Sequence, residues 1–242
     1  MKRFTAQIKA IVFAVIFSTY NLSFAVPNVI LFGMPGSGKG TISQHLKEKH
    51  NYYHICPGDL FRKEIREQTP FGKKIQSIVK KADYVDDVTT FNYLKTHIDS
   101  AIAKNTPIIL DGYPRSDKAA ALLSRYLKDK GIAANTHIIY ISAPEQLVKD
   151  RILNRVVCNN CKTVYNKKFN KPKEAGVCKC GNKLKVRPQD TKEIVQKRLN
   201  HFNKVQKPLY HKLKKNMTTY EIDSNTDKST LLATISNYIK SV

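Results

Sequence analysis

Residues 33–41 read Gly-Met-Pro-Gly-Ser-Gly-Lys-Gly-Thr, a spacing that can bind phosphate. Glycines let several backbone N–H groups converge on one anion, and the lysine adds a full positive charge. The apolar run 28–32 before the loop predicts a buried strand, and residues 41–50 after it predict a helix. This strand–loop–helix context favours a phosphate-binding loop over a glycine-rich turn without a ligand, although Thr41 stands one place later than in the general pattern. The expected phosphate contacts are Gly36, Ser37, Gly38, Lys39, Gly40 and Thr41.

A second chemical group follows another apolar run. Residues 107–110 predict a buried strand, and Asp111 comes directly after it. An acid at a strand end is often only a cap, but beside a phosphate loop a carboxylate suits Mg²⁺ that keeps its own waters. We therefore interpret Asp111 as the acid that orders Mg²⁺.

The elements that must position these groups alternate between strands and helices. This order predicts an α/β fold, with a parallel sheet covered by helices on both faces. Residues 157–187 show no such pattern and are interpreted as an irregular inserted domain. The other predicted strands are 52–55, 137–141 and 218–222, and the predicted helices are 60–68, 73–81, 87–103, 116–130, 144–154, 191–215 with a break near Pro208, and 228–239.

The chain of 242 residues carries a formal net charge of +23, which suits anionic ligands. The lysines are spread over the whole sequence, and no nucleic-acid-binding module accompanies them, so we expect a solvated basic surface and no nucleic-acid partner.

Residues 1–25 have the order of a signal peptide. Basic residues come first, an apolar run covers 10–17, and small residues flank Phe24. The apolar run is too short for a permanent membrane span, so no stable membrane association is expected after cleavage. We expect an exported protein whose mature part is 26–242. The alternative is an uncleaved extension of a cytoplasmic protein.

Several motifs, in order along residues 28–242, resemble those of adenylate kinases. The loop 33–41 is similar to their GxPGxGKGT, and 111–115 (Asp-Gly-Tyr-Pro-Arg) to their DG[FY]PR. The remaining matches are Gly58-Asp59-Leu60-Phe61-Arg62, Asp150-Arg151 with Arg155, Arg187-Pro188-Gln189-Asp190, and Lys197-Arg198-Leu199.

The resemblance implies reversible phosphoryl transfer from Mg-ATP to AMP, giving two ADP, in a monomer. It implies a P-loop kinase core over 26–242, a monophosphate-binding segment over 56–86 and a lid over 156–189. It also implies catalytic roles for Lys39, Arg115, Arg155, Arg187 and Arg198, stacking of Arg151 on the ATP base, monophosphate contacts from Pro57, Arg62, Val85, Gly112 and Arg115, and Mg²⁺ held through water by Asp111 and Asp59.

Two positions depart from the family pattern. Pro57 stands where the family usually has Thr or Ser, and Ala119 stands where its adenine-reading Gln is expected. Neither side chain can donate a hydrogen bond to a base, so we expect weaker discrimination in favour of AMP. The alternatives are a kinase of another or several nucleoside monophosphates, or an exported nucleotide-binding protein with incidental activity.

The lid segment carries a Cys-x-x-Cys pair and, after sixteen intervening residues, a Cys-x-Cys pair. Some bacterial adenylate kinases hold a structural Zn²⁺ in the lid with two Cys-x-x-Cys pairs, and here the second pair is one residue shorter. We expect Zn²⁺ on Cys158, Cys161, Cys178 and Cys180. Disulfides, or free thiols, remain the alternatives for an exported chain. Cys56 is expected to be a packed thiol.

Overall fold

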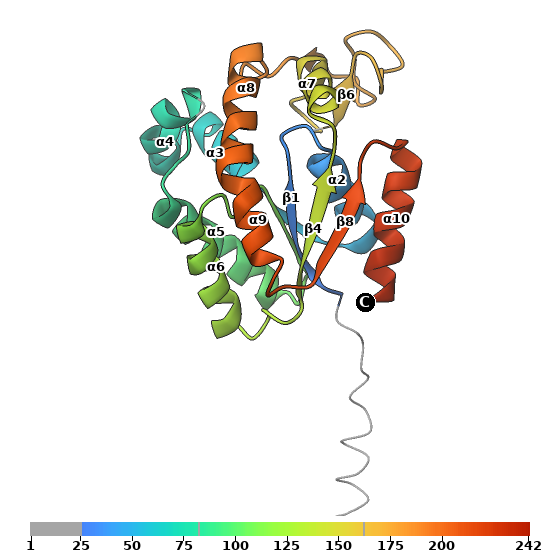
Figure 1. Cartoon of the computed structure of the whole chain (residues 1–242). Coiled ribbons are helices and arrows are strands. Elements are labelled where there is room, and N and C mark those ends of the chain that lie inside the picture. Colours follow the sequence, from blue (N-terminus) through green and yellow to red (C-terminus); the bar gives the residue numbers. More distant parts are fainter. Residues whose placement is uncertain (1–25, 82, 162) are drawn as a thin grey trace, which may run out of the picture.

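The computed structural model describes residues 26–81, 83–161 and 163–242, so the predicted signal peptide lies outside the described residues. The centre of the molecule is a parallel five-stranded sheet of order β2-β3-β1-β4-β8 (Figure 1). The predicted α/β class is therefore confirmed. The strands are β1 (Asn28–Gly33), β2 (Tyr53–Ile55), β3 (Ile108–Asp111), β4 (Thr136–Ser142) and β8 (Thr219–Asp223).

Helices cover both faces of this sheet, because its central strands are apolar on both sides. Every residue of β1 is buried. On one face, alternate strand residues such as Phe32 and Leu110 pack against α5 (Asp87–Ala103), α6 (Asp117–Asp129) and α9 (Lys207–Leu213). On the other face, Leu31 and its neighbours pack against α2 (Lys39–His50) and α10 (Lys228–Ser241).

The remaining helices stand above the carboxyl ends of the strands, where Figure 1 shows α3 and α4 on one side and α7 on the other. Polar side chains cap several helices: Thr191 Oγ1, for example, accepts from the backbone N–H of Ile194 at the start of α8. These helices are α3 (Pro57–Arg66), α4 (Pro70–Lys80), α7 (Glu145–Leu153) and α8 (Lys192–His201).

Two helices begin earlier than predicted, each at a proline. Helix α3 begins at Pro57 rather than at residue 60, and α4 begins at Pro70 rather than at residue 73. Proline is well tolerated in the first turn, where its missing N–H has no helical partner. The hydroxyl of Thr69 accepts from the Gly72 N–H and completes the start of α4.

The predicted helix 191–215 is interrupted six residues before Pro208. Helix α8 passes into a π-helical turn over Phe202–Gln206, which leads into α9. Phe202 is buried, so the irregular turn packs against the body of the molecule. The proline itself lies in the first turn of α9, a position that it occupies without strain.

The sequence predicted an irregular insert, but this prediction is wrong. It contains an antiparallel three-stranded sheet of order β6-β5-β7, formed by β5 (Arg155–Cys158), β6 (Val164–Asn166) and β7 (Leu184–Lys185). A small core of its own holds it together, with Val156, Tyr165 and two cysteines buried. The strands are too short for a period-2 pattern to be read from the sequence.

Within the described residues, none of the helices combines the length and the apolar character that crossing a membrane would require.

Candidate active site

The glycine-rich loop between β1 and α2 has the backbone shape of an anion cradle. Gly36 and Gly38 both have positive φ, of 84° and 107°. A Cβ at Gly36 would lie 2.8 Å from the carbonyl oxygen of Val148, so only glycine fits there. Gly38 is the residue before the first turn of α2, whose free N–H groups and positive dipole end therefore face the loop.

Lys39 is folded back over this loop. Its ammonium group donates to the carbonyl oxygens of Gly33 and Met34, at 2.7 and 2.8 Å. Burial lowers the pKa of Lys39 to about 8, although the nearby Asp111 carboxylate opposes the shift. The ammonium is thus held over the loop with little hydration, and it gains from a bound polyanion.

Asp111 lies at the carboxyl end of β3, next to the loop. One of its carboxylate oxygens accepts from the hydroxyl of Ser43 and contacts the ring of His54, both at 3.3 Å. Burial alone would raise the pKa of Asp111, but the bond to His54 and the charge of Lys39 outweigh it and hold the pKa below its usual value. The carboxylate therefore stays ionised beside the phosphate loop, as the water shell of Mg²⁺ requires.

Positive charges from separate elements converge above the loop. Within the described ranges, the guanidinium groups of Arg187 and Arg198 make no ion pair or hydrogen bond with another residue. Burial and repulsion by Arg115 and Arg155 together lower the pKa of Arg198 to about 10. Burial and the charges of Arg155 and Arg62 also lower the pKa of Arg187. Unpaired guanidinium groups in a partly dehydrated cluster are costly unless an anion joins them.

Two further predicted site residues, the phosphoryl-site Arg155 and the monophosphate contact Arg62, are held by partners within the protein. Arg155 donates two hydrogen bonds to the Asp190 carboxylate, at 2.8 and 2.6 Å. Arg62 forms a 2.5 Å ion pair with Asp59. Burial alone would raise the pKa of Asp59, but the charges of Arg62 and Arg187 lower it. The predicted Mg²⁺ contact Asp59 is therefore turned toward an arginine.

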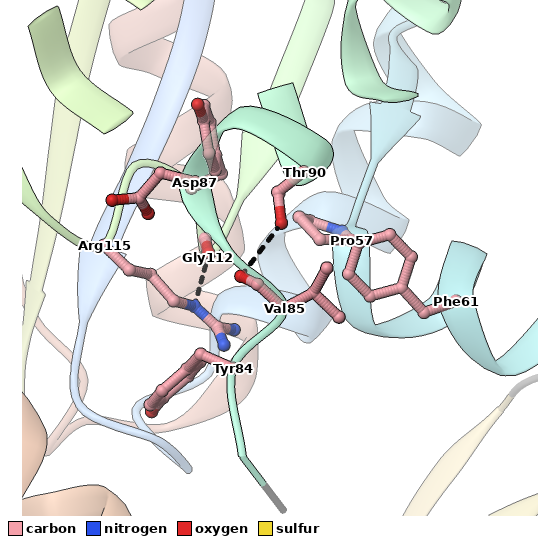
Figure 2. Close-up of a pocket in the computed structure, with 9 residues that line it drawn as sticks. Pro57, Phe61, Tyr84, Val85, Asp87, Thr90, Gly112 and Arg115 are labelled. Atoms are coloured by element: carbon pink, nitrogen blue, oxygen red, sulfur yellow. Dashed lines mark hydrogen bonds between the residues drawn. The ribbon is translucent and has the colours of Figure 1, made fainter. Parts of the chain in front are cut away.

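A small pocket lies next to another of the predicted site arginines, Arg115 (Figure 2). Its apolar wall includes Pro57, Phe61 and Val85. Arg115 lies at the other side, held by a 2.6 Å hydrogen bond from its Nε to the carbonyl oxygen of Gly112, with its guanidinium over the ring of Tyr84. A flat apolar group would fit the wall, with an anion at Arg115. Five monophosphate contacts were predicted, and four of them, all except Arg62, line this pocket.

The sequence was compared with known proteins. The family model described as adenylate kinase matches residues 31–218. The chain belongs to the adenylate kinase family. Three relatives named adenylate kinase are similar over most of their length. The relative from Clostridium tetani is 36% identical over 89% of this chain and 99% of its own. Those from Mycoplasma mobile and Oceanobacillus iheyensis are 34% and 38% identical, over 82% and 71% of this chain and 91% and 80% of their own.

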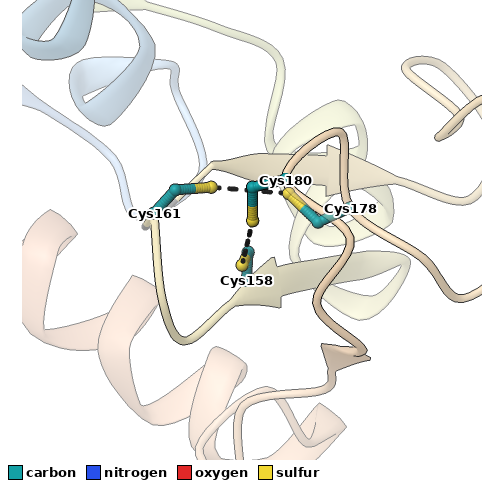
Figure 3. A group of neighbouring side chains, drawn as sticks. All are labelled: Cys158, Cys161, Cys178 and Cys180. Atoms are coloured by element: carbon teal, nitrogen blue, oxygen red, sulfur yellow. Dashed lines mark hydrogen bonds between the residues drawn. The ribbon is translucent and has the colours of Figure 1, made fainter.

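As predicted for the longer adenylate kinase lids, the four cysteines of the insert lie together (Figure 3). Their sulfur atoms all lie within 4.8 Å of one another, with Cys158–Cys180 at 3.5 Å and Cys161–Cys178 at 3.4 Å. Ligands around tetrahedral Zn²⁺ with bonds of about 2.3 Å stand roughly 3.8 Å apart, so the cluster fits that ion. The shortened Cys-x-Cys pair still presents both thiols, because a turn closes from Cys178 to Gly181.

The two positions that depart from the adenylate kinase pattern lie differently in the fold. Pro57 lines the pocket, whereas Ala119 does not. Ala119 is buried in the first turn of α6, where its N–H bonds to Ser116 and its carbonyl oxygen accepts from the hydroxyl of Tyr113. Neither of these two positions therefore gives the pocket a side-chain hydrogen-bond donor for a base.

Sequence reasoning missed several contributors to the site. Tyr84 packs under Arg115 and against the ring of His201, at 4.4 Å between ring centres. His54 contacts Asp111, and burial raises the pKa of the neighbouring Cys56 thiol to about 12. These contacts join residues that are far apart in the chain, so no local sequence pattern predicts them. Arg151, predicted to stack on the ATP base, donates to the hydroxyl and carbonyl oxygen of Ser224, the residue that follows β8.

Proposed function

We propose that this chain transfers the γ-phosphoryl group of Mg-ATP reversibly to AMP, giving two ADP. The observation that carries the proposal is a pair of unpaired guanidinium groups: Arg198 lies close enough to Lys39 to lower its pKa, and Arg187 lies close to Arg155, which also faces Arg198. A transferring phosphoryl group spreads negative charge over three oxygens, and it needs fixed positive charge more than a covalent partner. The names of the relatives support AMP and ATP as the substrate pair.

The roles of the residues follow from where they lie. The loop N–H groups and Lys39 hold the ATP phosphates, and Arg115 holds the acceptor phosphate. Arg155, Arg187 and Arg198 stabilise the charge that develops during transfer. No residue needs to act as a strong base, because the acceptor is already an ionised phosphate.

Mg²⁺ bound to ATP supplies charge neutralisation and orients the phosphate oxygens. In our proposal Asp111, together with Asp59, binds it through water. Asp111 fits this task because it is buried, ionised and next to Lys39.

Closure over the reactants excludes water that would otherwise accept the phosphoryl group. We propose that residues 156–189 are the lid over ATP and that 56–86 are the segment over the acceptor. Arg187 of the lid lies near enough to lower the pKa of Asp59 in the acceptor segment. We also propose a structural Zn²⁺ on the four lid cysteines, because their donor set and spacing suit that ion.

A relaxed choice of acceptor is the second candidate, and a specific observation favours it. Of the residues that line the pocket, Pro57, Phe61 and Val85 have no side-chain donor, and the hydroxyls of Thr90 and Tyr113 already donate to backbone carbonyl oxygens. Sites that read a base by hydrogen bonds discriminate strongly, and sites without such bonds do not. We therefore expect GMP, CMP or UMP to compete with AMP better than at a site that reads its base by side-chain hydrogen bonds.

The deciding experiment is a coupled assay of the full chain with Mg-ATP and each of AMP, GMP, CMP and UMP. We expect ADP formation with AMP, and loss of about 10²- to 10³-fold in kcat in Arg198→Ala, the cost of removing one donor from developing charge. Arg125→Ala, an exposed arginine on α6, is the matched control. Binding of ATP without transfer to any monophosphate would instead favour the exported nucleotide-binding protein.

We propose further that residues 1–25 direct export and that the enzyme acts as a monomer. The relative from Clostridium tetani is matched over 99% of its length by 89% of this chain, which leaves about a tenth of this chain without a counterpart there. The phosphate loop, acceptor pocket and arginines all come from one chain, which supports a monomer. N-terminal sequencing of the protein from a bacterial periplasm, and light scattering of the purified sample, test these two points.

A further inference from the structure

Three potential metal ligands meet at the edge of the sheet, outside the lid. The Nε2 of His54, the thiol of Cys56 and a carboxylate oxygen of Asp111 all lie within 4.8 Å of one another. The separation of His54 Nε2 from Asp111 Oδ2 is 3.3 Å. Ligand atoms bound to tetrahedral Zn²⁺ at about 2.0–2.1 Å stand roughly 3.3 Å apart, so this pair already has the required spacing.

The strand pairing explains why the three groups meet. Strands β2 and β3 run parallel, with His54 opposite Ile109 and Ile55 opposite Leu110. Continued by one residue, this register places Cys56 opposite Asp111. Side chains two apart on a strand share a face, so His54 and Cys56 point to the same side as Asp111. Because β2 is the edge strand, the cluster is not covered by a further strand.

We propose that His54, Cys56 and Asp111 form a site for a borderline-soft divalent cation such as Zn²⁺, and that its occupation inhibits phosphoryl transfer. An imidazole, a thiolate and a carboxylate suit Zn²⁺, whereas Mg²⁺ and Ca²⁺ prefer oxygen ligands alone. The thiol proton passes to solvent as the metal–sulfur bond forms. Three protein ligands leave the fourth position of the tetrahedron open to water or to a phosphate oxygen.

Inhibition follows from the double use of Asp111, and this part rests on the proposed kinase function. A carboxylate bound to Zn²⁺ no longer orders the water shell of the Mg²⁺ that accompanies ATP. Lys39 lies close enough to Asp111 to lower the pKa of its carboxyl group. A cation bound to Asp111 therefore places a second positive charge close to Lys39. The described residues then offer two proposed Zn²⁺ sites, the lid site with four thiolates and this site with one thiolate.

The binding test counts metal ions on the full chain. Equilibrium dialysis against Co²⁺ or Zn²⁺ is expected to give one more bound metal per chain in the wild type than in His54→Gln or Cys56→Ser. Gln at 54 keeps a donor for Asp111 but is a poor zinc ligand, and Ser at 56 is nearly isosteric with Cys. His45→Gln, a half-buried histidine on α2, is the matched control and retains the wild-type count.

The ligand set gives a second readout that needs no variant. Bound Co²⁺ added after the lid has been filled with Zn²⁺ is expected to show the weak charge-transfer absorption of a single thiolate. Equal metal counts in the wild type and in both variants, or no thiolate band, would overturn the site.

The inhibition test compares each protein with itself, with and without Zn²⁺, at fixed Mg-ATP and AMP. We expect His54→Gln and Cys56→Ser to need at least about tenfold more Zn²⁺ for half-inhibition than the wild type, as lost ligand interactions cost 10- to 100-fold in affinity. Metal binding without this difference would overturn the inhibition alone. Absence of kinase activity in every protein would overturn the proposed function but not the site.

Discussion

Arg155 and Asp190 are joined by two hydrogen bonds, of 2.8 and 2.6 Å, across the two points where the chain enters and leaves the segment that we propose as the lid. Arg155 begins β5, and Asp190 precedes the cap of α8. The Asp190 side chain is 1% exposed and that of Arg155 is 17% exposed, so the pair is sheltered from water. The carboxylate fixes the plane of the guanidinium, and it thereby positions one of the charges that we assign to phosphoryl transfer.

Asp190→Asn should lower kcat more than it raises the KM for either nucleotide. It removes a charge-assisted hydrogen bond worth about 1.5–3 kcal/mol, which corresponds to a loss of about tenfold or more. Steady-state kinetics with both substrates varied would measure the split. Glu193→Gln, an exposed acid in the first turn of α8, is the control. An unchanged kcat in Asp190→Asn would mean that Arg155 does not depend on this partner.

The activity should fall as pH rises through about 8. Lys39 in the free enzyme has a pKa lowered to about 8 by burial, so its charge is present below that pH and is lost above it. The profile of kcat/KM for ATP, which reports the free enzyme, should show this descending limb. In Lys39→Arg, whose charge persists to much higher pH, the limb should move upward when each profile is scaled to its own maximum. A limb at the same pH in both proteins would assign it to another group.

Pro57→Thr should raise the preference for AMP over the other monophosphates. The new hydroxyl would face the pocket wall, where a hydrogen bond to the base is worth about 0.5–1.5 kcal/mol, or about three- to tenfold in kcat/KM ratio. The readout is a competition assay with pairs of monophosphates. Pro57→Ala removes the ring without adding a hydroxyl and should leave the ratio near the wild-type value. Equal shifts in both variants would point to pocket shape instead.

Removal of the Zn²⁺ that we propose on the four cysteines should loosen the proposed lid before the core. Cys178 is buried in the small lid cluster, which shares no residue with the two sheet cores. In Cys178→Ser, or after chelation, we expect one Zn²⁺ fewer per chain and at least about tenfold faster proteolysis within 156–189, because metal binding stabilises the folded form. Mass spectrometry of the fragments locates the cuts. Zn²⁺ added back should protect the wild type; disulfides found in the purified wild type would contradict the metal site.

The sequence predicted what local patterns encode. The apolar run before Gly33 and the glycines after it were sufficient to place β1 and the phosphate loop, because both depend on neighbouring residues. The predicted starts of α3 and α4 were wrong because Pro57 and Pro70 were left outside the helices, although proline suits a first turn.

Pairings between distant residues escaped prediction. Nothing in the order of residues shows that Asp190 holds Arg155, or that Tyr84 lies beneath Arg115. The lid strands were missed because each is short and their core is made partly of sulfur. Such contacts depend on the closed three-dimensional arrangement, and a single sequence contains no direct record of it.

The π-helical turn at Phe202–Gln206 also sets the angular relation between the two helices it joins. Each residue of an α-helix advances the helix by about 100°, so a wider turn rotates everything beyond it relative to everything before it. Arg198 can therefore lie near Lys39 and Arg115 while Tyr210 faces the sheet, 4.1 Å from the ring of Tyr140. A one-residue deletion here that restored regular α-helix would leave one of these two faces misdirected. The length of this short turn is thus a constraint on how the chain can tolerate insertions and deletions.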